Sequence, residues 1–448
     1  MNSDTSPALW IKDPLAILAD GAERGVVVQD GRIVELVAAG REPRAPAVKT
    51  FDADAHVVLP GLINTHHHFY QTLTRAVPAA LDRELFPWLQ ALYPLWARLT
   101  PEAVDLSSTL AMAELMLSGC TLTTDHHYVF PKGVEDGIDI QVAAAKRLGL
   151  RALLTRGSMN RSQRDGGLPP DNVVQDEDAI LADSERLVAR YHQAGDGAII
   201  QIALAPCSPF SVTTSLMRAT AELAERLNVR MHTHLAETEN RYCLEIHRCR
   251  PLDYLEECGW LNGRTWLAHG VHFNADEFPR LASAGTAVTH CACSNQTLAS
   301  GTCSVCPMEE AGVAVGLGVD GSASNDSSNL MQEVRAAFLL QRGQYGIGKV
   351  SHRDALRWAT KGSAACTGRA DVGEIAVGML ADLALFRLDE LRFSGSGDPL
   401  AALVLCGAHR ADRVMVGGRW IVENGQIPGL DVADLIRRHS AAARKLQA

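Results

Sequence analysis

The middle of the chain alternates short apolar runs with longer segments whose apolar residues recur at helical spacing. The apolar runs predict strands at residues 57–66, 121–126, 152–156, 199–205, 229–234, 265–269, 287–290 and 313–320. Helical patterns lie between them, for example at residues 102–118 and 216–227. Regular alternation of strands and helices predicts parallel βαβ units, and eight such strands close a barrel. We therefore expect an α/β fold with a (β/α)8 barrel of the TIM type.

Both ends of the chain show a different pattern, in which short apolar runs flank glycine turns. Asp30-Gly31 separates residues 26–29 from 33–37, and Gly417-Gly418 separates residues 413–416 from 420–423. Strand–turn–strand units at both termini predict one small β-sandwich module assembled from the two ends. We expect residues 1–59 and 372–448 to form this module, and residues 60–371 to form the barrel.

Composition narrows the class of partner. The chain has 448 residues and a net charge of −10, with no block of lysine and arginine, so a nucleic-acid partner is not expected. No segment approaches the roughly 18 to 20 apolar residues of a membrane helix. The N-terminal residues lack the pattern of a secretory signal, and the eleven cysteines are typical of reduced thiols. We expect a cytoplasmic protein that acts on a small molecule.

Polar residues stand at the C-terminal end of nearly every predicted strand. This edge of a barrel carries the active site in barrel enzymes. Histidines scattered through a core would not favour one end of each strand. The residues are His66, His68, Asp125, His126, Arg156, Cys207, His234, His269, His290 and Asp320.

Four of these residues form a candidate metal site. His66 and His68 are two apart on a strand and share a face, while His234 ends the fifth strand and Asp320 the eighth. Three imidazoles and a carboxylate suit a single Zn²⁺, although Fe²⁺ accepts the same mixture of ligands. The alternatives are an ordinary histidine cluster and a turn aspartate before Gly321.

Glu237 and two further histidines are candidate catalytic residues. Glu237 lies three residues after His234, where a carboxylate can carry a proton from an attacking water to a leaving nitrogen. His269 and His290 can orient that water or Asp320, although His290 can equally be a packed core residue. His232 is expected in the core, behind the metal ligands.

A group of thiols offers a second, less favoured metal site. The group consists of one Cys-x-Cys pair and one Cys-x-x-Cys pair. One interpretation is that these thiols bind a structural zinc. The other is that the thiols are small buried hydrophobic side chains, which we favour. The residues are Cys291, Cys293, Cys303 and Cys306.

The chain resembles the amidohydrolase superfamily, in the mononuclear branch that includes guanine, S-adenosylhomocysteine, cytosine and triazine deaminases. The resemblance rests on residues 60–68, the strand ending at Asp320, and residues 373–383. It implies a metal on His66, His68, His234 and Asp320, with Glu237 as the proton shuttle. It also implies that His269 contacts the hydrolytic water and that the protein is a homo-oligomer.

The substrate expected from the resemblance is a free purine base. Residues 66–75 and 84–89 are most similar to 8-oxoguanine deaminases, which implies conversion of 8-oxoguanine to urate and ammonia. Gln71 carries an amide, which suits the donors and acceptors of a purine edge, and Trp88 and Cys207 are further candidate contacts. Cys207 also replaces a histidine of nucleoside-type relatives, and the fourth strand lacks the lysine of binuclear relatives.

Other activities use the same metal-binding residues. Guanine, isoxanthopterin, isocytosine and hydroxytriazine deaminases are the alternatives within the branch. A barrel that serves only as a non-catalytic scaffold is a more distant alternative, because scaffolds of this kind lose ligands that are all present here.

Overall fold

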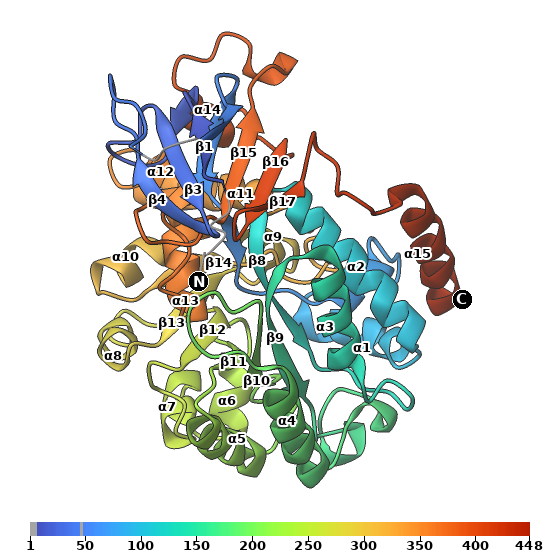
Figure 1. Cartoon of the computed structure of the whole chain (residues 1–448). Coiled ribbons are helices and arrows are strands. Elements are labelled where there is room, and N and C mark those ends of the chain that lie inside the picture. The colour runs from blue at the N-terminus through green and yellow to red at the C-terminus, as the bar shows by residue number, and fades with distance from the viewer. Residues whose placement is uncertain (1–6, 45–47) are drawn as a thin grey trace.

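The computed structural model describes residues 7–44 and 48–448. Its centre is an eight-stranded sheet in which neighbouring strands are parallel and follow the order of the sequence (Figure 1). The expected (β/α)8 barrel is confirmed. The strands are β7(Leu62–Asn64), β8(Cys120–His127), β9(Arg151–Ser158), β10(Ile200–Pro206), β11(Met231–Leu235), β12(Thr265–His269), β13(Ala287–His290) and β14(Val315–Leu317).

The barrel closes where its first and last strands meet. The backbone N–H of Thr65 donates to the carbonyl of Leu317 at 3.0 Å, and the N–H of Asp320 donates to the carbonyl of His66 at 3.0 Å. These two bonds continue just beyond β7 and β14. They therefore fix the segments that carry two candidate metal ligands against each other.

Helices surround the barrel and begin and end at residues suited to these positions. Thr100 caps the first turn of α2 by accepting from the N–H of Ala103, and Pro101 follows at the first helical position. The longer helices are α1(Leu85–Trp96), α2(Pro101–Leu117), α3(Gly137–Leu148), α4(Glu177–Tyr191), α5(Thr214–Leu227), α11(Leu330–Tyr345) and α15(Val432–Gln447). The shorter ones are α6(Asn240–Ile246), α7(Pro251–Glu257), α8(Phe278–Ala284), α9(Ala292–Thr297), α10(Val305–Glu310), α12(His352–Arg357), α13(Ser363–Thr367), α14(Pro399–Leu405) and the 3-10 turn η1(Phe69–Thr74).

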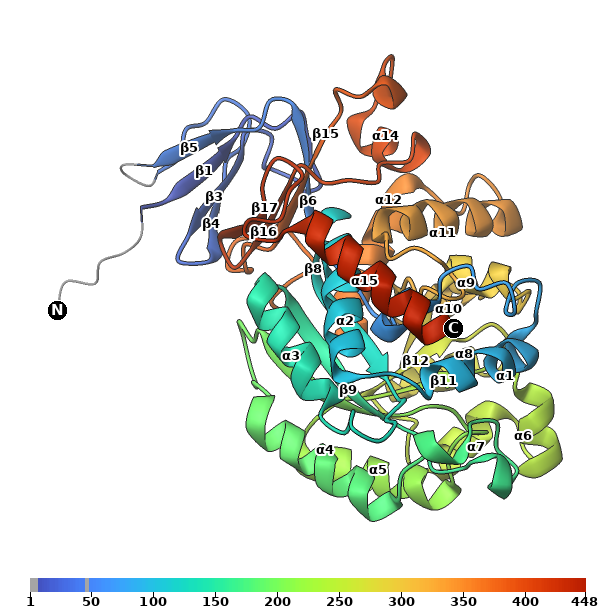
Figure 2. The ribbon, with the colours of Figure 1, turned by 90° about the vertical axis from the view of Figure 1, so that its right-hand side faces the viewer.

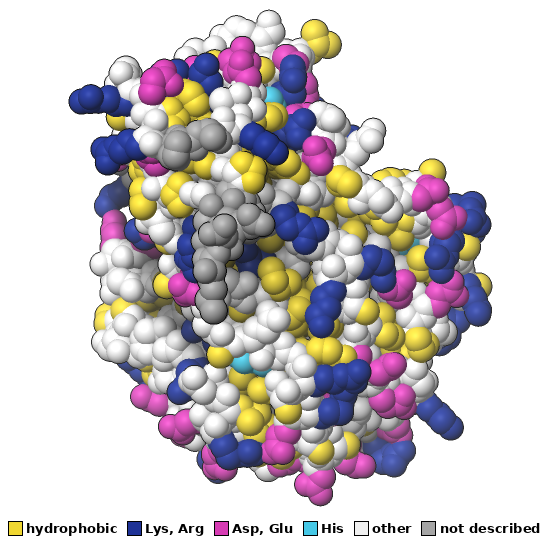
Figure 3. All heavy atoms as spheres, viewed as in Figure 1, with side chains coloured by type: hydrophobic (Ala, Val, Ile, Leu, Met, Phe, Trp, Pro, Cys, Tyr) yellow, Lys and Arg dark blue, Asp and Glu magenta, His cyan; other side chains and the backbone are white. Residues whose placement is uncertain are grey.

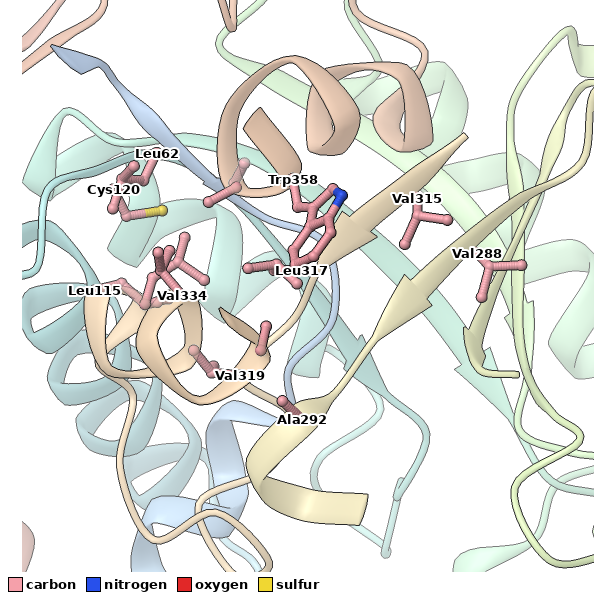
Figure 4. Close-up of a cluster of buried hydrophobic side chains, with 14 of the residues drawn as sticks. Leu62, Leu115, Cys120, Val288, Ala292, Val315, Leu317, Val319, Val334 and Trp358 are labelled. Atoms are coloured by element: carbon pink, nitrogen blue, oxygen red, sulfur yellow. The ribbon is translucent and has the colours of Figure 1, made fainter. Parts of the chain in front are cut away.

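The main hydrophobic core lies between the barrel strands and these helices. Val315 and Leu317 of β14 are fully or almost fully buried and belong to the same cluster as Trp358 and Val334 of α11 (Figure 4). Gly316 lies between them on the other face of the strand, where a Cβ would lie 2.9 Å from the Cys366 sulfur. This close approach explains why glycine separates the two apolar residues of β14.

Two smaller sheets are built from both ends of the chain. One has the order β4-β3-β1-β5 and the other β17-β16-β15-β6-β2. Apolar residues of both sheets, such as Ile11 and Leu383, share one buried cluster, as expected for a sandwich; the domain boundaries remain a prediction. The strands are β1(Leu9–Lys12), β2(Ala16–Ile17), β3(Gly25–Gln29), β4(Arg32–Leu36), β5(Lys49–Asp52), β6(His56–Pro60), β15(Leu383–Arg387), β16(Arg413–Val416) and β17(Arg419–Val422).

The apolar run at residues 57–66 is two strands, not one, so that prediction was wrong. β6 pairs with β15 in the terminal module, and β7 pairs with β8 in the barrel. The change of sheet occurs at Gly61, where a Cβ would lie 2.1 Å from the Thr121 hydroxyl. Both strands are buried on both faces, so hydrophobicity alone does not reveal the boundary.

The last helix departs from the predicted module as well. α15 lies along α2 and next to η1, beside the barrel (Figure 2). The C-terminal region from residue 372 therefore contributes strands to the module and a helix to the barrel side. None of the helices in the described ranges is both long and apolar enough to cross a membrane. On the face shown in Figure 3, acidic and basic side chains are intermingled.

Candidate metal centre and active site

Four side chains predicted as metal ligands meet at the C-terminal edge of the barrel. His66 Nε2 and His68 Nε2 lie 3.3 and 3.4 Å from Asp320 Oδ1. His68 Nε2 lies 3.1 Å from His234 Nε2. All four residues are buried or nearly so. The structure thus brings together residues separated by more than 250 positions in the chain.

Hydrogen bonds to carbonyl groups orient two of these imidazoles. His68 Nδ1 donates to the carbonyl of His126 at 2.7 Å, and His234 Nδ1 donates to the carbonyl of Cys207 at 2.6 Å. A carbonyl only accepts, so each Nδ1 carries the proton. The lone pair of each Nε2 therefore points to the centre of the site.

A third histidine is oriented through His232. His232 Nδ1 donates to the carbonyl of Trp266 at 2.8 Å, which leaves His232 Nε2 as an acceptor. His66 Nδ1 lies 2.8 Å from that atom and must donate to it. His66 Nε2 is then unprotonated as well, and His232 lies behind a metal ligand, where it fixes its tautomer.

The donor set fits a divalent cation. His68 Nε2 and His234 Nε2 face each other at 3.1 Å with no proton available for either, and His66 Nε2 is buried without a hydrogen-bond partner in the described part of the chain. Burial lowers the pKa of His68 to about 3 and also lowers those of His66 and His234. Neutral imidazoles beside a carboxylate are the form that binds a metal ion.

The backbone is strained where these strands end. His269 and Asp320 have φ angles of 78° and 63°, in the left-handed region that non-glycine residues avoid. Ala236, next to Glu237, has a φ of 55°. Each such residue costs on the order of 1 to 3 kcal/mol. These three residues are a minority of the non-glycine residues with positive φ in the described chain, but all three lie at or beside candidate catalytic groups.

Glu237 and His269 form a pair beside the metal ligands. His269 Nε2 lies 3.5 Å from Glu237 Oε2. Burial raises the pKa of Glu237 to about 7. Burial alone would lower the pKa of His269, but the carboxylates of Glu237 and Asp320 outweigh it and raise that pKa. The pair can therefore hold or release a proton near neutral pH, as acid–base catalysis requires.

Two residues that the sequence did not single out hold this pair. Asn295 Oδ1 accepts from His269 Nδ1 at 2.9 Å, and the Ser300 hydroxyl donates to Glu237 Oε1 at 3.3 Å. Both residues are buried. They come from α9 and the turn after it, where no periodic pattern marks a residue as functional.

A small cavity opens beside the cluster. Glu237, His269, Asp320 and the three residues predicted to contact substrate line this cavity. Tyr128 also lines the cavity. Because it lies two residues after His126, its position in the sequence could have predicted this placement. The lining residues are His68, Gln71, Leu85, Trp88, Leu89, Tyr93, Tyr128, Cys207, Phe210, His234, Glu237, His269, Leu298, Asp320 and Ser324.

The three residues predicted to contact substrate offer different chemistry to the cavity. Gln71 Oε1 is buried and has no hydrogen-bond partner in the described residues, so this oxygen can accept a bond from a ligand. Trp88 Nε1 donates to the carbonyl of Ala323 at 3.0 Å, which leaves its ring for packing. Burial raises the pKa of Cys207 to about 12, so this group is a neutral thiol.

Residues 57–421 match the model of the amidohydrolase family. The chain belongs to the amidohydrolase family. It is 61% identical to the 8-oxoguanine deaminase of Pseudomonas aeruginosa over 98% of each chain. It is 35% identical to an isoxanthopterin deaminase from an unknown prokaryotic organism over 96% of each chain. Among solved structures, zinc-bound atrazine chlorohydrolase from Arthrobacter aurescens matches with a TM-score of 0.91 and 30% identity, covering 98% of this chain and 100% of that one.

Four other predicted residues of this amidohydrolase lie outside the cavity. His126 Nε2 donates to the carbonyl of Ala205 at 2.9 Å. His290 does not line it; its Nε2 lies 3.5 Å from Gln341 Nε2, and its catalytic role remains a prediction without a supporting contact. Asp125 accepts from the backbone N–H of Phe69 at 2.6 Å and so anchors η1. Arg156 pairs with Asp183 at 2.8 Å.

The cysteine group does not assemble into a metal site. The described residues contain two groups with suitably close donor atoms, one of His66, His126 and His234 and the other of His66, Cys291 and Asp320. Neither group combines two of the four thiols. Cys291 and Cys303 are buried, whereas Cys293 and Cys306 are partly exposed. The interpretation as core thiols therefore fits better than a structural zinc.

Proposed function

We propose that this amidohydrolase is a hydrolytic deaminase that converts 8-oxoguanine and water to urate and ammonia. The observation that carries the proposal is the 61% identity to an 8-oxoguanine deaminase across 98% of both chains. The residues that line the cavity support it, because an unpaired amide oxygen and several aromatic side chains suit a flat ring with polar edges.

We assign a single divalent ion to His66, His68, His234 and Asp320. When bound there, the ion lowers the pKa of a coordinated water toward neutrality. Zinc is the preferred ion because three imidazoles and one carboxylate suit it, and because the similar atrazine chlorohydrolase was solved with zinc. Iron(II) is the alternative.

Glu237 is the proposed proton carrier. Its carboxylate accepts a proton from the hydrolytic water as the oxygen attacks the ring carbon that bears the amino group. A pKa of about 7 allows Glu237 to return this proton to the departing nitrogen. The new C–O bond and the broken C–N bond leave a carbonyl on the ring and release ammonia.

His269 and Asn295 act on the same step. The Nδ1–H of His269 is held by Asn295, so its Nε2 is directed toward Glu237. From this position His269 orients the hydrolytic water. Gln71 binds the purine edge, and the neutral thiol of Cys207 lies against the ring without adding charge.

The setting of the reaction is also part of the proposal. We propose a cytoplasmic enzyme that binds a small free base and has neither a nucleic-acid nor a membrane partner, in keeping with its net charge of −10. The homo-oligomeric state rests on the family resemblance alone.

The first test is a panel of bases with zinc-loaded protein. We expect 8-oxoguanine to give the highest kcat/KM for ammonia release, above guanine, isoxanthopterin, isocytosine and hydroxytriazine. A clear preference for isoxanthopterin or a triazine would overturn the substrate assignment. Absence of turnover with every base, in protein with a full complement of metal, would favour a scaffold.

The second test concerns Glu237. Glu237→Gln is expected to lower kcat by a factor of about 10² to 10⁴, the usual contribution of general acid–base catalysis, with bound zinc unchanged. Glu245→Gln makes the same chemical change at an exposed residue of α6 and should leave kcat unaltered. A Glu237→Gln enzyme with near-normal kcat would remove Glu237 from the mechanism.

A further inference from the structure

The C-terminal helix α15 contacts the turn that carries Gln71. Its residue Gln447 donates through Nε2 to the carbonyl of Leu73 at 2.7 Å. His439 Nε2 lies 3.0 Å from the hydroxyl oxygen of Thr72. In Figure 2 the helix runs beside α2 with its end at the barrel. Residues from the far end of the chain thus bind both residues that follow Gln71.

The direction of the His439 bond follows from the other bond of Thr72. The Thr72 hydroxyl donates its proton to the carbonyl of Phe69 at 3.0 Å, so toward His439 it can only accept. His439 therefore donates from Nε2. His439 is 7% exposed. Loss of a buried hydrogen bond of this kind is costly because the remaining partner cannot form a replacement bond with water.

The turn η1 is one hydrogen-bonded unit, so its parts move together. The N–H of Gln71 donates to the carbonyl of His68 at 3.0 Å, and the Thr74 hydroxyl donates to the carbonyl of Gln71 at 3.1 Å. Leu446 of α15 is buried in the same hydrophobic cluster as Trp88, a wall of the cavity. A shift of α15 would therefore reach the Gln71 amide through both backbone and packing.

The His68 carbonyl accepts from the Gln71 N–H, but the metal ligands also have anchors of their own in the barrel. His66 and His68 are tied to the barrel through the bond from the Asp320 N–H to the His66 carbonyl and the bond from His68 Nδ1 to the His126 carbonyl. Neither anchor involves α15. Loosening α15 should therefore disturb substrate recognition more than the metal site.

We propose that α15 positions the substrate-recognising amide, with His439 and Gln447 as positioning residues that hold η1 against the cavity. The proposal rests on the proposed function, because Gln71 is assigned to the substrate there. Neither positioning residue lines the cavity. Their effect is exerted through the backbone of Thr72 and Leu73.

The test separates KM from kcat in His439→Ala, Gln447→Ala and the double variant. We expect KM to rise about three- to tenfold for each single change, the effect of one lost hydrogen bond, with kcat within twofold and zinc content unchanged. His439→Gln retains an N–H donor and should lie closer to wild type. Arg438→Ala is the matched control, because Arg438 is on the same helix but pairs with exposed Glu102.

A binding measurement gives a readout independent of turnover. In the Glu237→Gln background, calorimetric titration with 8-oxoguanine should show the same rise in Kd when His439→Ala and Gln447→Ala are added. Unchanged KM and Kd in folded double variant would overturn the proposal, as would a fall in kcat and zinc content at constant KM. Failure of wild-type protein to act on 8-oxoguanine would instead refute the proposed function. The ratio of variant to wild-type KM would then be measured with the base that the wild-type protein prefers.

Discussion

Substitution of Gly321 by alanine is the sharpest test of how the cavity recognises its ligand. Gly321 follows Asp320, and its backbone lies against the Gln71 amide. A Cβ at this position would lie 1.9 Å from Gln71 Oε1 and 2.3 Å from Gln71 Cδ. The φ angle of Gly321 is outside the left-handed region, so alanine adds no backbone strain. The effect of the substitution falls on the amide.

The size of the effect follows from the distance that the amide must move. Ordinary van der Waals contact begins at 3.4 Å, so the oxygen at 1.9 Å must withdraw by about 1.5 Å. An amide displaced this far loses its bond to the substrate, worth about 0.5 to 1.5 kcal/mol. Since 1.4 kcal/mol is a factor of ten, we expect kcat/KM for 8-oxoguanine to fall about two- to twelvefold.

The assay compares kcat/KM, zinc content and thermal unfolding of Gly321→Ala with those of wild type. Gly343→Ala is the matched control, because a Cβ at residue 343 meets no atom within 4 Å. The control should retain wild-type kcat/KM. Wild-type kcat/KM in zinc-loaded Gly321→Ala would refute the assignment of Gln71 to substrate recognition.

Three further predictions concern catalysis and stability. Asn295→Ala frees the Nδ1–H of His269, so kcat should fall about tenfold or more in steady-state assays, while zinc content stays constant. Burial lowers the pKa of His439 to about 4 in the folded protein. As the pH falls from about 6.5 to 4, His439 is therefore protonated in the unfolded chain before it is protonated in the folded protein, which favours unfolding. Urea unfolding should show a loss of up to about 3 kcal/mol over this window, and His439→Gln should remove that contribution. Asp382→Asn leaves the buried Arg151 without its ion-pair partner, and thermal unfolding should report a loss of about 3 to 5 kcal/mol.

Much of the candidate metal site was predictable because it depends on short-range periodicity. Alternating positions predicted that His66 and His68 share a face, and the ends of barrel strands predicted that His234 and Asp320 lie at the same edge. In the structure β7 ends at Asn64, so His66 and His68 lie in the segment after the strand rather than on it. Both rules act within a few residues, so they can be read from a single sequence. The same rules explain why His290 was selected although it lies outside the cavity, because periodicity gives a face but not how far a side chain reaches.

What the sequence did not reveal depends on contacts between distant segments. Asn295 and Ser300 reach Glu237 and His269 from a helix and a turn that have no distinctive pattern. Thr72 and His439 are 367 residues apart, and no local property of either residue indicates the other. Such partners are set by tertiary packing, which a single sequence encodes only as a whole.

The change of sheet at Gly61 has a mechanical consequence. The chain passes from β6 to β7 through one residue, and its N–H donates to the carbonyl of Asp382 at 2.8 Å while that of Leu62 donates to the carbonyl of Gly119 at 3.0 Å. No slack exists in which a hinge could operate. The two parts should melt as a single calorimetric peak, and exchanging the module for that of another enzyme would require a junction at the single residue between two paired strands.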